Sequence, residues 1–77
     1  MNNKDALCII YRNLTNWSGD LKDIKFNISG RDIYAEDGVG MISIFDDATD
    51  KLICILYEDG FFSSCDADWL AESYEGW

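Results

Sequence analysis

Carboxylate side chains are the residues of this sequence most able to do chemistry, and they are concentrated in its second part. Residues 1–31 hold five cationic and three acidic side chains, a net charge of +2, whereas residues 32–77 hold Lys51 against twelve acidic side chains, a net charge of −11. Carboxylates can act as general acid and base, bind divalent cations, or pair with Arg and Lys of another protein. A surface charged in this way repels nucleic acid and anionic membranes, and it attracts basic protein surfaces within about 8–10 Å in physiological salt.

The sequence lacks several residues and motifs that are typical of enzyme active sites. It has no His, so the commonest general base and the Ser-His and Cys-His pairs are missing. Its three cysteines form no C-x-x-C pair, which removes the usual spacing and the fourth ligand of a structural zinc site. Cys8 and Cys54 lie in apolar runs and are predicted to be buried. Cys65, near a predicted helix start, is interpreted as a partly buried residue, with a reactive thiol of lowered pKa as the less favoured alternative. We predict no catalytic residue, no metal and no cofactor.

Two local patterns resemble ligand-binding loops but lack their defining residues. Asp46-Asp47-x-x-Asp50 lacks the D-x-D-x-D-G order and the closing Glu of a calcium loop. Gly38-x-Gly40 is not continued by the Gly or Lys of a phosphate-binding loop, so we interpret both as turn glycines. The spacing of the carboxylates in the sequence does not exclude the catalytic carboxylate pair of a glycosidase. A chain of 77 residues, however, has little volume for a sugar-binding cleft.

Hydrophobic periodicity predicts one compact acidic domain over residues 1–77 with an α+β fold. The expected order is an N-terminal helix, an antiparallel meander of four to five strands and a short C-terminal helix, packed as a two-layer sandwich. The first helix should run from about 4 to 13, with Asn2 or Asn3 as its cap. The second should begin after Ser64 or Asp66 and end at Gly76.

Between the helices the apolar period changes to two at Ile24, and turn residues recur about every ten positions. Ser29-Gly30 has the composition of a tight hairpin turn. The segments 41–45 and 52–57 are apolar on both faces. We therefore expect these two strands to be central, either covered on both faces or lying across a partner.

The loops of a meander alternate between the two ends of the sheet. The loop of Glu36 and Asp37 and the loop of Glu58 and Asp59 should therefore lie at one end, roughly 10 Å apart. The 46–50 loop should lie at the opposite end. Trp and Tyr are more numerous than a thin core needs, and both residue types dominate binding hot spots. The predicted partner-binding residues are Glu36, Asp37, Asp46, Asp47, Asp50, Glu58, Asp59, Asp66, Asp68, Trp69, Glu72, Glu75 and Trp77.

The sequence also suggests where the chain works. It opens without the charged and apolar regions of a signal peptide, no apolar stretch approaches the roughly 20 residues of a membrane span, and its cysteines are odd in number. We expect a cytoplasmic protein, in the host cytoplasm if it is phage-encoded, with no membrane and no nucleic acid as a direct partner.

In size, acidity and α+β pattern the chain resembles the broad group of phage- or plasmid-encoded inhibitors that block host nucleic-acid-binding machinery, which includes anti-CRISPR, anti-restriction and DNA-mimic proteins. The resemblance covers overall character and no motif, so it assigns no residue. It implies a non-enzymatic inhibitor that occupies a basic surface of a nucleic-acid-binding protein or complex. The alternatives are an immunity protein against a basic nuclease toxin, a small structural or regulatory subunit that binds through an apolar sheet face, or an acidic surface that is only solvated.

Overall fold

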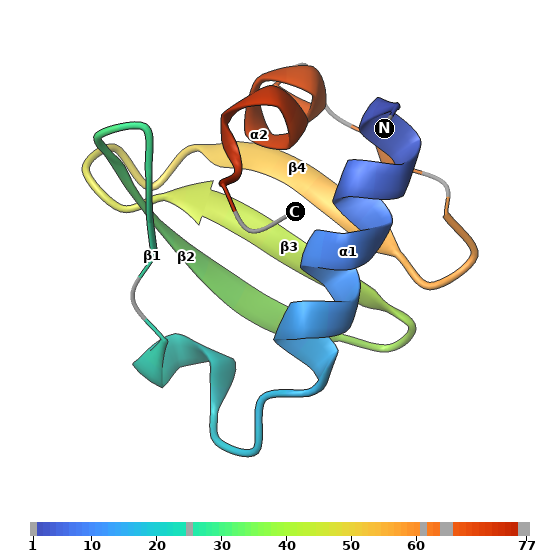
Figure 1. The fold of residues 1–77 in the computed structure, drawn as a ribbon. Coiled ribbons are helices and arrows are strands. Elements are labelled where there is room, and N and C mark those ends of the chain that lie inside the picture. Colours follow the sequence, from blue (N-terminus) through green and yellow to red (C-terminus); the bar gives the residue numbers. More distant parts are fainter. Residues whose placement is uncertain (1, 25, 61, 64–65, 76–77) are drawn as a thin grey trace.

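The structure is a computed structural model that describes residues 2–24, 26–60, 62–63 and 66–75. It confirms the predicted α+β fold of helix, antiparallel meander and short helix (Figure 1). The elements follow one another as α1 (Asn3–Thr15), the 3-10 helix η1 (Leu21–Asp23), β1 (Phe26–Ile28), β2 (Arg31–Gly38), β3 (Met41–Asp46), β4 (Leu52–Tyr57), β5 (Phe62–Ser63) and α2 (Ala67–Ser73).

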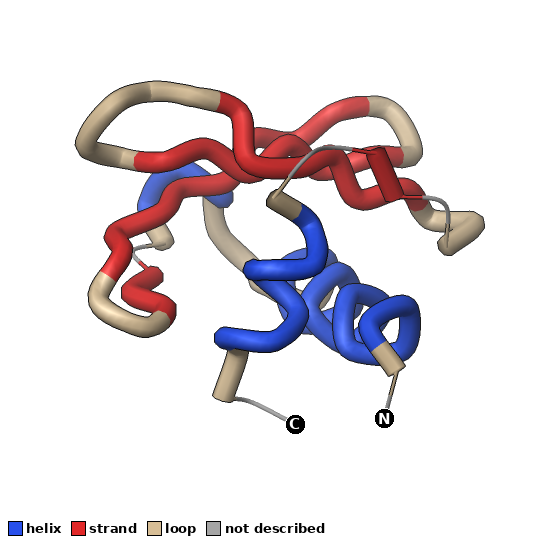
Figure 2. Tube along the Cα trace, turned by 90° about the horizontal axis from the view of Figure 1, so that it is seen from above, coloured by secondary structure: helices blue, strands red, loops and turns tan. Residues whose placement is uncertain are grey.

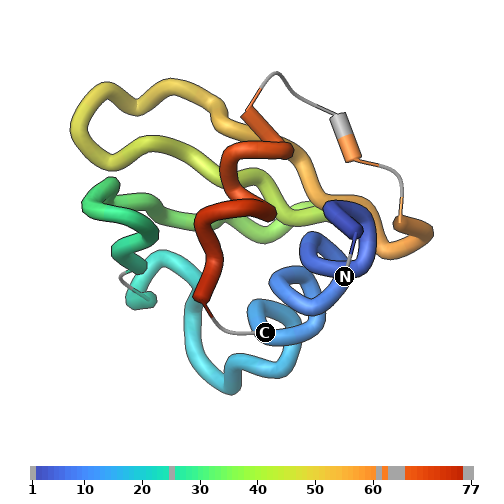
Figure 3. The backbone as a smooth tube through the Cα atoms, turned by 45° about the horizontal axis from the view of Figure 1, so that its top comes forward, coloured from blue at the N-terminus to red at the C-terminus, as the bar shows by residue number. Residues whose placement is uncertain are grey.

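The molecule has two layers. All five strands are antiparallel and lie in chain order, β1-β2-β3-β4-β5. Both helices lie on one face of the sheet, which Figure 2 shows from above. They contact each other and β4, and they run side by side over the strands (Figure 3). No described helix covers the opposite face, so the described helices do not meet the first alternative, coverage of both faces, and contact of that face with a partner stays a prediction.

Helix α1 forms where local signals agree. The side chain of Asn2 accepts a hydrogen bond from the backbone N–H of Asp5 at 2.8 Å and caps the first turn, as predicted. Leu7, Ile10 and Leu14 recur at helical spacing and are buried against the sheet. One face of α1 therefore packs in the core, and Lys4 and Arg12 on the opposite face are exposed to solvent.

The hairpin between β1 and β2 has the predicted turn at Ser29-Gly30. Ile28 pairs with Arg31, which leaves two residues in the loop, and both have positive φ, 51° for Ser29 and 82° for Gly30. Positive φ at both central positions is the signature of the type I′ turn that matches strand twist. The first strand begins at Phe26 instead of Ile24, because the side chain of Asp20 caps η1 through the backbone N–H of Lys22 at 3.0 Å.

The core lies between the helices and the inner face of the sheet. Ile42, Ile44, Leu56 and Leu70 are each at most 1% exposed. Burying a side chain of this size stabilises the fold by about 1.5–3 kcal/mol before entropy is counted. Cys54 is fully buried among them, as expected, whereas Cys8 is half-buried and only partly meets the prediction.

Helix α2 is shorter than predicted. Asp66 stands at its N-cap position without a side-chain cap hydrogen bond, and the helix ends at Ser73 instead of Gly76. Tyr74 is already extended, with φ −73° and ψ 126°, and its hydroxyl accepts a hydrogen bond from Asn13 Nδ2 at 2.7 Å. This contact with α1 ends the helix. The predicted cap Ser64, Cys65, Gly76 and Trp77 lie outside the described residues.

Candidate protein-binding surface

The face of the sheet opposite the helices is the most distinctive surface of the described chain. Directly paired residues of antiparallel strands point to the same side. The register pairs Tyr34 with Phe45 and Phe45 with Leu52, and it pairs Met41 with Tyr57. We call this surface the outer sheet face. Its residues are Tyr34, Glu36, Met41, Ser43, Phe45, Leu52, Ile55 and Tyr57.

Most of the outer sheet face is apolar. The rings of Tyr34 and Phe45 are stacked, with centroids 5.1 Å apart and planes 13° from parallel. Leu52, beside Phe45, is 44% exposed, and Ile55 is only partly buried. Scattered apolar residues are normal on protein surfaces, whereas a continuous apolar patch with a polar border is typical of a contact site. The predicted partner-binding set omitted these side chains, although the apolar runs 41–45 and 52–57 already contained the signal.

Carboxylates border this apolar patch on the side of β2. The Tyr34 hydroxyl donates a hydrogen bond to Asp50 Oδ1 at 3.1 Å, and Glu36 lies on the face itself, opposite Ser43. Desolvation by burial and the hydrogen bond to Asp50 raise the pKa of Tyr34 above its ordinary value of 10.0, and the charges of Asp50, Glu36 and Asp47 raise it further. The phenol therefore stays neutral in a negative local field at physiological pH.

The carboxylates of the two predicted loops do lie at one end of the sheet. The backbone N–H of Glu58 donates to the carbonyl oxygen of Gly40 at 3.1 Å. The Glu58 side chain also lies beside this glycine, since a Cβ added to Gly40 would be 3.6 Å from the carboxyl carbon of Glu58. Glu36 and Asp37 precede the same turn on β2. Glu36, Asp37, Glu58 and Asp59 are exposed.

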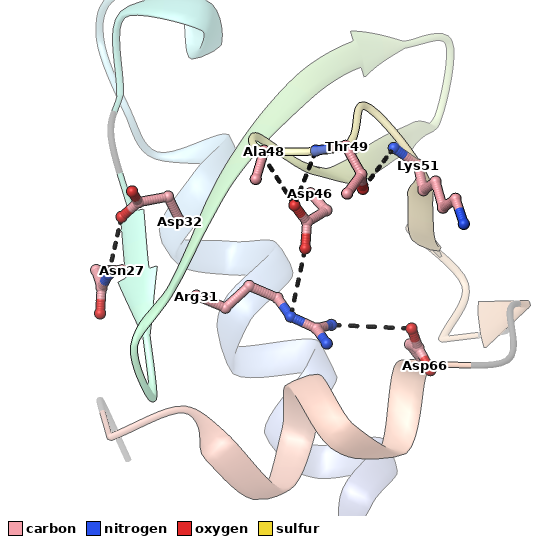
Figure 4. Close-up of polar contacts among 8 residues, drawn as sticks. All are labelled: Asn27, Arg31, Asp32, Asp46, Ala48, Thr49, Lys51 and Asp66. Atoms are coloured by element: carbon pink, nitrogen blue, oxygen red, sulfur yellow. Dashed lines mark hydrogen bonds and ion pairs between the residues drawn. The ribbon is translucent and has the colours of Figure 1, made fainter.

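At the opposite end, Asp46 and Asp66 make contacts within the molecule. Asp46 accepts hydrogen bonds from the backbone N–H groups of Ala48 and Thr49, at 2.9 and 3.2 Å, and shapes the turn between β3 and β4. Arg31 lies between Asp46 and Asp66, with nitrogen–oxygen distances of 3.4 and 3.8 Å (Figure 4). Its guanidinium also lies 4.1 Å from the ring centroid of Trp69.

These contacts divide the predicted partner-binding residues. Asp46, Asp66 and Trp69 hold β2, the turn after β3 and the start of α2 together, so they are less available to a partner. Asp68 accepts a hydrogen bond from Asn3 Nδ2 at 3.0 Å but stays exposed. Asp47, Asp50, Glu72 and Glu75 are exposed, and Trp77 lies outside the described residues.

The described residues show no metal site. They contain no group of three or more His, Cys, Asp or Glu side chains that could hold a metal ion. A hollow of about 140 Å³ lies between α1 and the edge of the sheet at β1, and its walls are apolar except for the hydrogen-bonded pair Asn13 and Tyr74. Its walls hold no carboxylate, whereas a hollow of about 230 Å³ beside β1 and β2 has Asp32 and Asp47 among its lining residues. Of the helices described, none has the length and apolar character to cross a membrane.

Comparison with family models, curated proteins and solved structures finds no match for this chain. The function therefore has to be argued from the outer sheet face and the carboxylates around it.

Proposed function

We propose that this protein is a non-enzymatic acidic inhibitor that blocks a basic, nucleic-acid-binding surface of another protein. The class is that of anti-CRISPR and anti-restriction proteins of mobile elements that imitate DNA. The observation that supports it best is the position of exposed carboxylates around an uncovered apolar sheet face, with Glu36 on the face and Asp47 and Asp50 beside it.

Carboxylates can replace phosphates at such a surface because both offer paired oxygen acceptors to guanidinium and ammonium groups. The charge of the chain, −9 in total, accelerates encounter with a basic partner and disfavours acidic ones. Affinity then has to come from desolvated contacts, since exposed ion pairs contribute at most about 1 kcal/mol each.

The test is competition on a partner isolated from the native host by affinity capture and identified by mass spectrometry. At constant ionic strength, added DNA or RNA should raise the apparent dissociation constant of this protein for its partner. The increase should be proportional to the fraction of partner that the nucleic acid occupies. A ternary complex of this protein, its partner and fully bound nucleic acid would exclude direct blocking.

Charge reversal locates the contact. Changing Glu36, Asp37, Glu58 and Asp59 to Lys should abolish partner binding and leave the fold intact, because surface changes of this kind shift stability by about 0.5 kcal/mol or less each. Glu36→Lys alone should weaken binding far more than Asp23→Lys, which reverses an exposed acidic side chain of η1. Equal effects of the two single changes would mean that only net charge matters.

A second function is favoured by the apolar character of the same face. A small structural or regulatory subunit would bind its partner through Phe45, Leu52 and Ile55 with little help from charge. Its affinity would barely change with salt, whereas the affinity of a charge-driven inhibitor would fall steeply as ionic strength rises.

A further inference from the structure

We propose that the outer sheet face binds an arginine-bearing segment of the partner, with a guanidinium stacked on the Tyr34–Phe45 pair and paired with Glu36 and Asp50. This inference rests on the proposed function and names its contact.

The molecule already holds one arginine by this combination of groups. The guanidinium carbon of Arg31 lies 4.1 Å from the centroid of the Trp69 ring, and two carboxylates, Asp46 and Asp66, lie within 3.8 Å of its nitrogens. An aromatic face and a carboxylate satisfy different parts of a guanidinium, since the ring contacts its plane and the acid accepts its N–H groups. Lysine carries a compact, strongly hydrated charge and gains less from the same surroundings.

The outer sheet face repeats this combination at the surface. Two stacked rings, Tyr34 and Phe45, replace the single indole. Asp50 accepts a hydrogen bond from the Tyr34 hydroxyl at 3.1 Å. Glu36 is exposed, and it lies two residues after Tyr34 on β2, on the same side of the sheet. The charges of Asp50, Glu36 and Asp47 all act on Tyr34, so the local field at this ring favours a cation.

Charge decides which occupant fits the face. A second copy of the chain would bring its own Glu36 and Asp50 against the same groups, and each copy carries a net charge of −9. Like charges across an interface cost binding energy, so self-association is disfavoured. A partner segment with Arg and apolar side chains is complementary in both respects.

The size of the face matches a single segment. The six residues of β3 span about 20 Å, and three neighbouring strands span about 10 Å. A helix with its side chains is about 10–12 Å wide, and an extended strand is narrower. The apolar side chains along β3 and β4, Phe45, Leu52 and Ile55, can pack against the apolar side chains of such a segment.

The test uses a synthetic peptide of alternating Arg and Leu, about six residues long to match a strand. Titration into ¹⁵N-labelled protein at constant ionic strength should shift the amide resonances of 34, 36, 43, 45 and 55. The Lys-Leu peptide should bind at least about threefold more weakly. Shifts confined to α2 or to the sheet ends, or equal affinity for both peptides, would overturn the proposal.

Two variants give the test its specificity. The double variant Tyr34→Thr, Phe45→Thr keeps strand-forming residues and should raise the dissociation constant of the Arg-Leu peptide about tenfold or more. Glu36→Gln keeps the shape of an exposed side chain and should raise it about two- to fivefold. The matched controls are Trp17→Thr, which removes a half-exposed ring elsewhere, and Asp23→Asn on η1. Equal losses in variants and controls would refute the assignment.

The outcomes separate this inference from the proposed function. If a captured partner excludes nucleic acid but binds the Tyr34→Thr, Phe45→Thr variant as tightly as the parent, inhibition stands and the contact is wrong. If the variant loses the partner but nucleic acid does not compete, the contact stands and inhibition by blocking is wrong. A wild-type dimer in sedimentation that the double variant dissociates would show that the occupant is a second copy, and would overturn the proposal.

Discussion

Replacing Arg31 with Met removes a side chain that contacts Asp46 at the end of β3, Asp66 at the start of α2 and the ring of Trp69. Met keeps much of the apolar stem and loses the charge and the planar head. We expect the fold to survive, because Asp46 retains its two backbone hydrogen bonds and the apolar core is untouched.

The magnitude follows from exposure and distance. The Arg31 and Asp46 side chains are 37% and 17% exposed and their atoms are 3.4 Å apart, so this pair should contribute about 0.5–1 kcal/mol. Asp66 is 49% exposed and 3.8 Å away, and solvent screening reduces its share to about 0.3 kcal/mol. The contact with Trp69 adds about 0.5–1 kcal/mol. The loss should therefore total about 1.3–2.3 kcal/mol, or roughly 5–18 °C in Tm for a chain of this size.

The assay is urea unfolding of the parent, Arg31→Met and the control Arg12→Met, which removes an exposed arginine of α1. Arg12→Met should change the free energy of unfolding by about 0.5 kcal/mol or less. Combining Arg31→Met with Trp69→Leu in a double-mutant cycle should give a coupling energy of about 0.5–1 kcal/mol. If Arg31→Met costs no more than Arg12→Met, or the coupling is zero, the stabilising role of this arginine is wrong.

Three further predictions concern the fold. Asn2→Ala should lower the free energy of unfolding by about 1 kcal/mol, measured by urea unfolding, because Asp5 loses its cap hydrogen bond. Ser29→Asn should raise the free energy of unfolding by about 0.5 kcal/mol, because Asn tolerates φ of 51° better than Ser. A loss of stability in thermal unfolding would contradict this turn geometry. Burial, and then the nearby Asp66 carboxylate, raise the pKa of Cys54 from 9.0 to about 12, so its thiolate forms more easily in the unfolded chain. Stability from this thiol should be complete below pH 9.0 and fall by up to about 1.4 kcal/mol per pH unit towards pH 12, a decline that Cys54→Ala should reduce and that pH-dependent unfolding would measure.

The sequence predicted the elements whose signals are local. Asn2 and the apolar residues of α1 lie within one segment, and Ser29-Gly30 encodes its own turn through positive φ. Alternation and turn spacing were enough for the meander, so the acidic loops were also placed at the correct ends of the sheet.

The features that the sequence did not predict depend on contacts between distant residues. Helix α2 ends early because Tyr74 meets Asn13, which is 61 positions away. Asp46 and Asp66 were predicted to bind a partner protein, because the arginine that pairs with them, Arg31, lies far away in the basic part of the sequence. The apolar runs 41–45 and 52–57 indicated that the outer sheet face is apolar, but an apolar strand pattern does not reveal whether a helix or a partner covers it.

The short strands at the two edges of the sheet have a consequence for how the protein behaves in concentrated solution. In the described part of the chain β1 has three residues and β5 has two, so each of these edge strands offers only a short row of backbone groups on which another chain could extend the sheet. Aggregation would have to proceed by stacking of outer sheet faces, which carboxylate repulsion opposes at neutral pH. Solubility should therefore fall when acidification reduces the net negative charge of the chain, and fibres grown from the sheet edges should not form first.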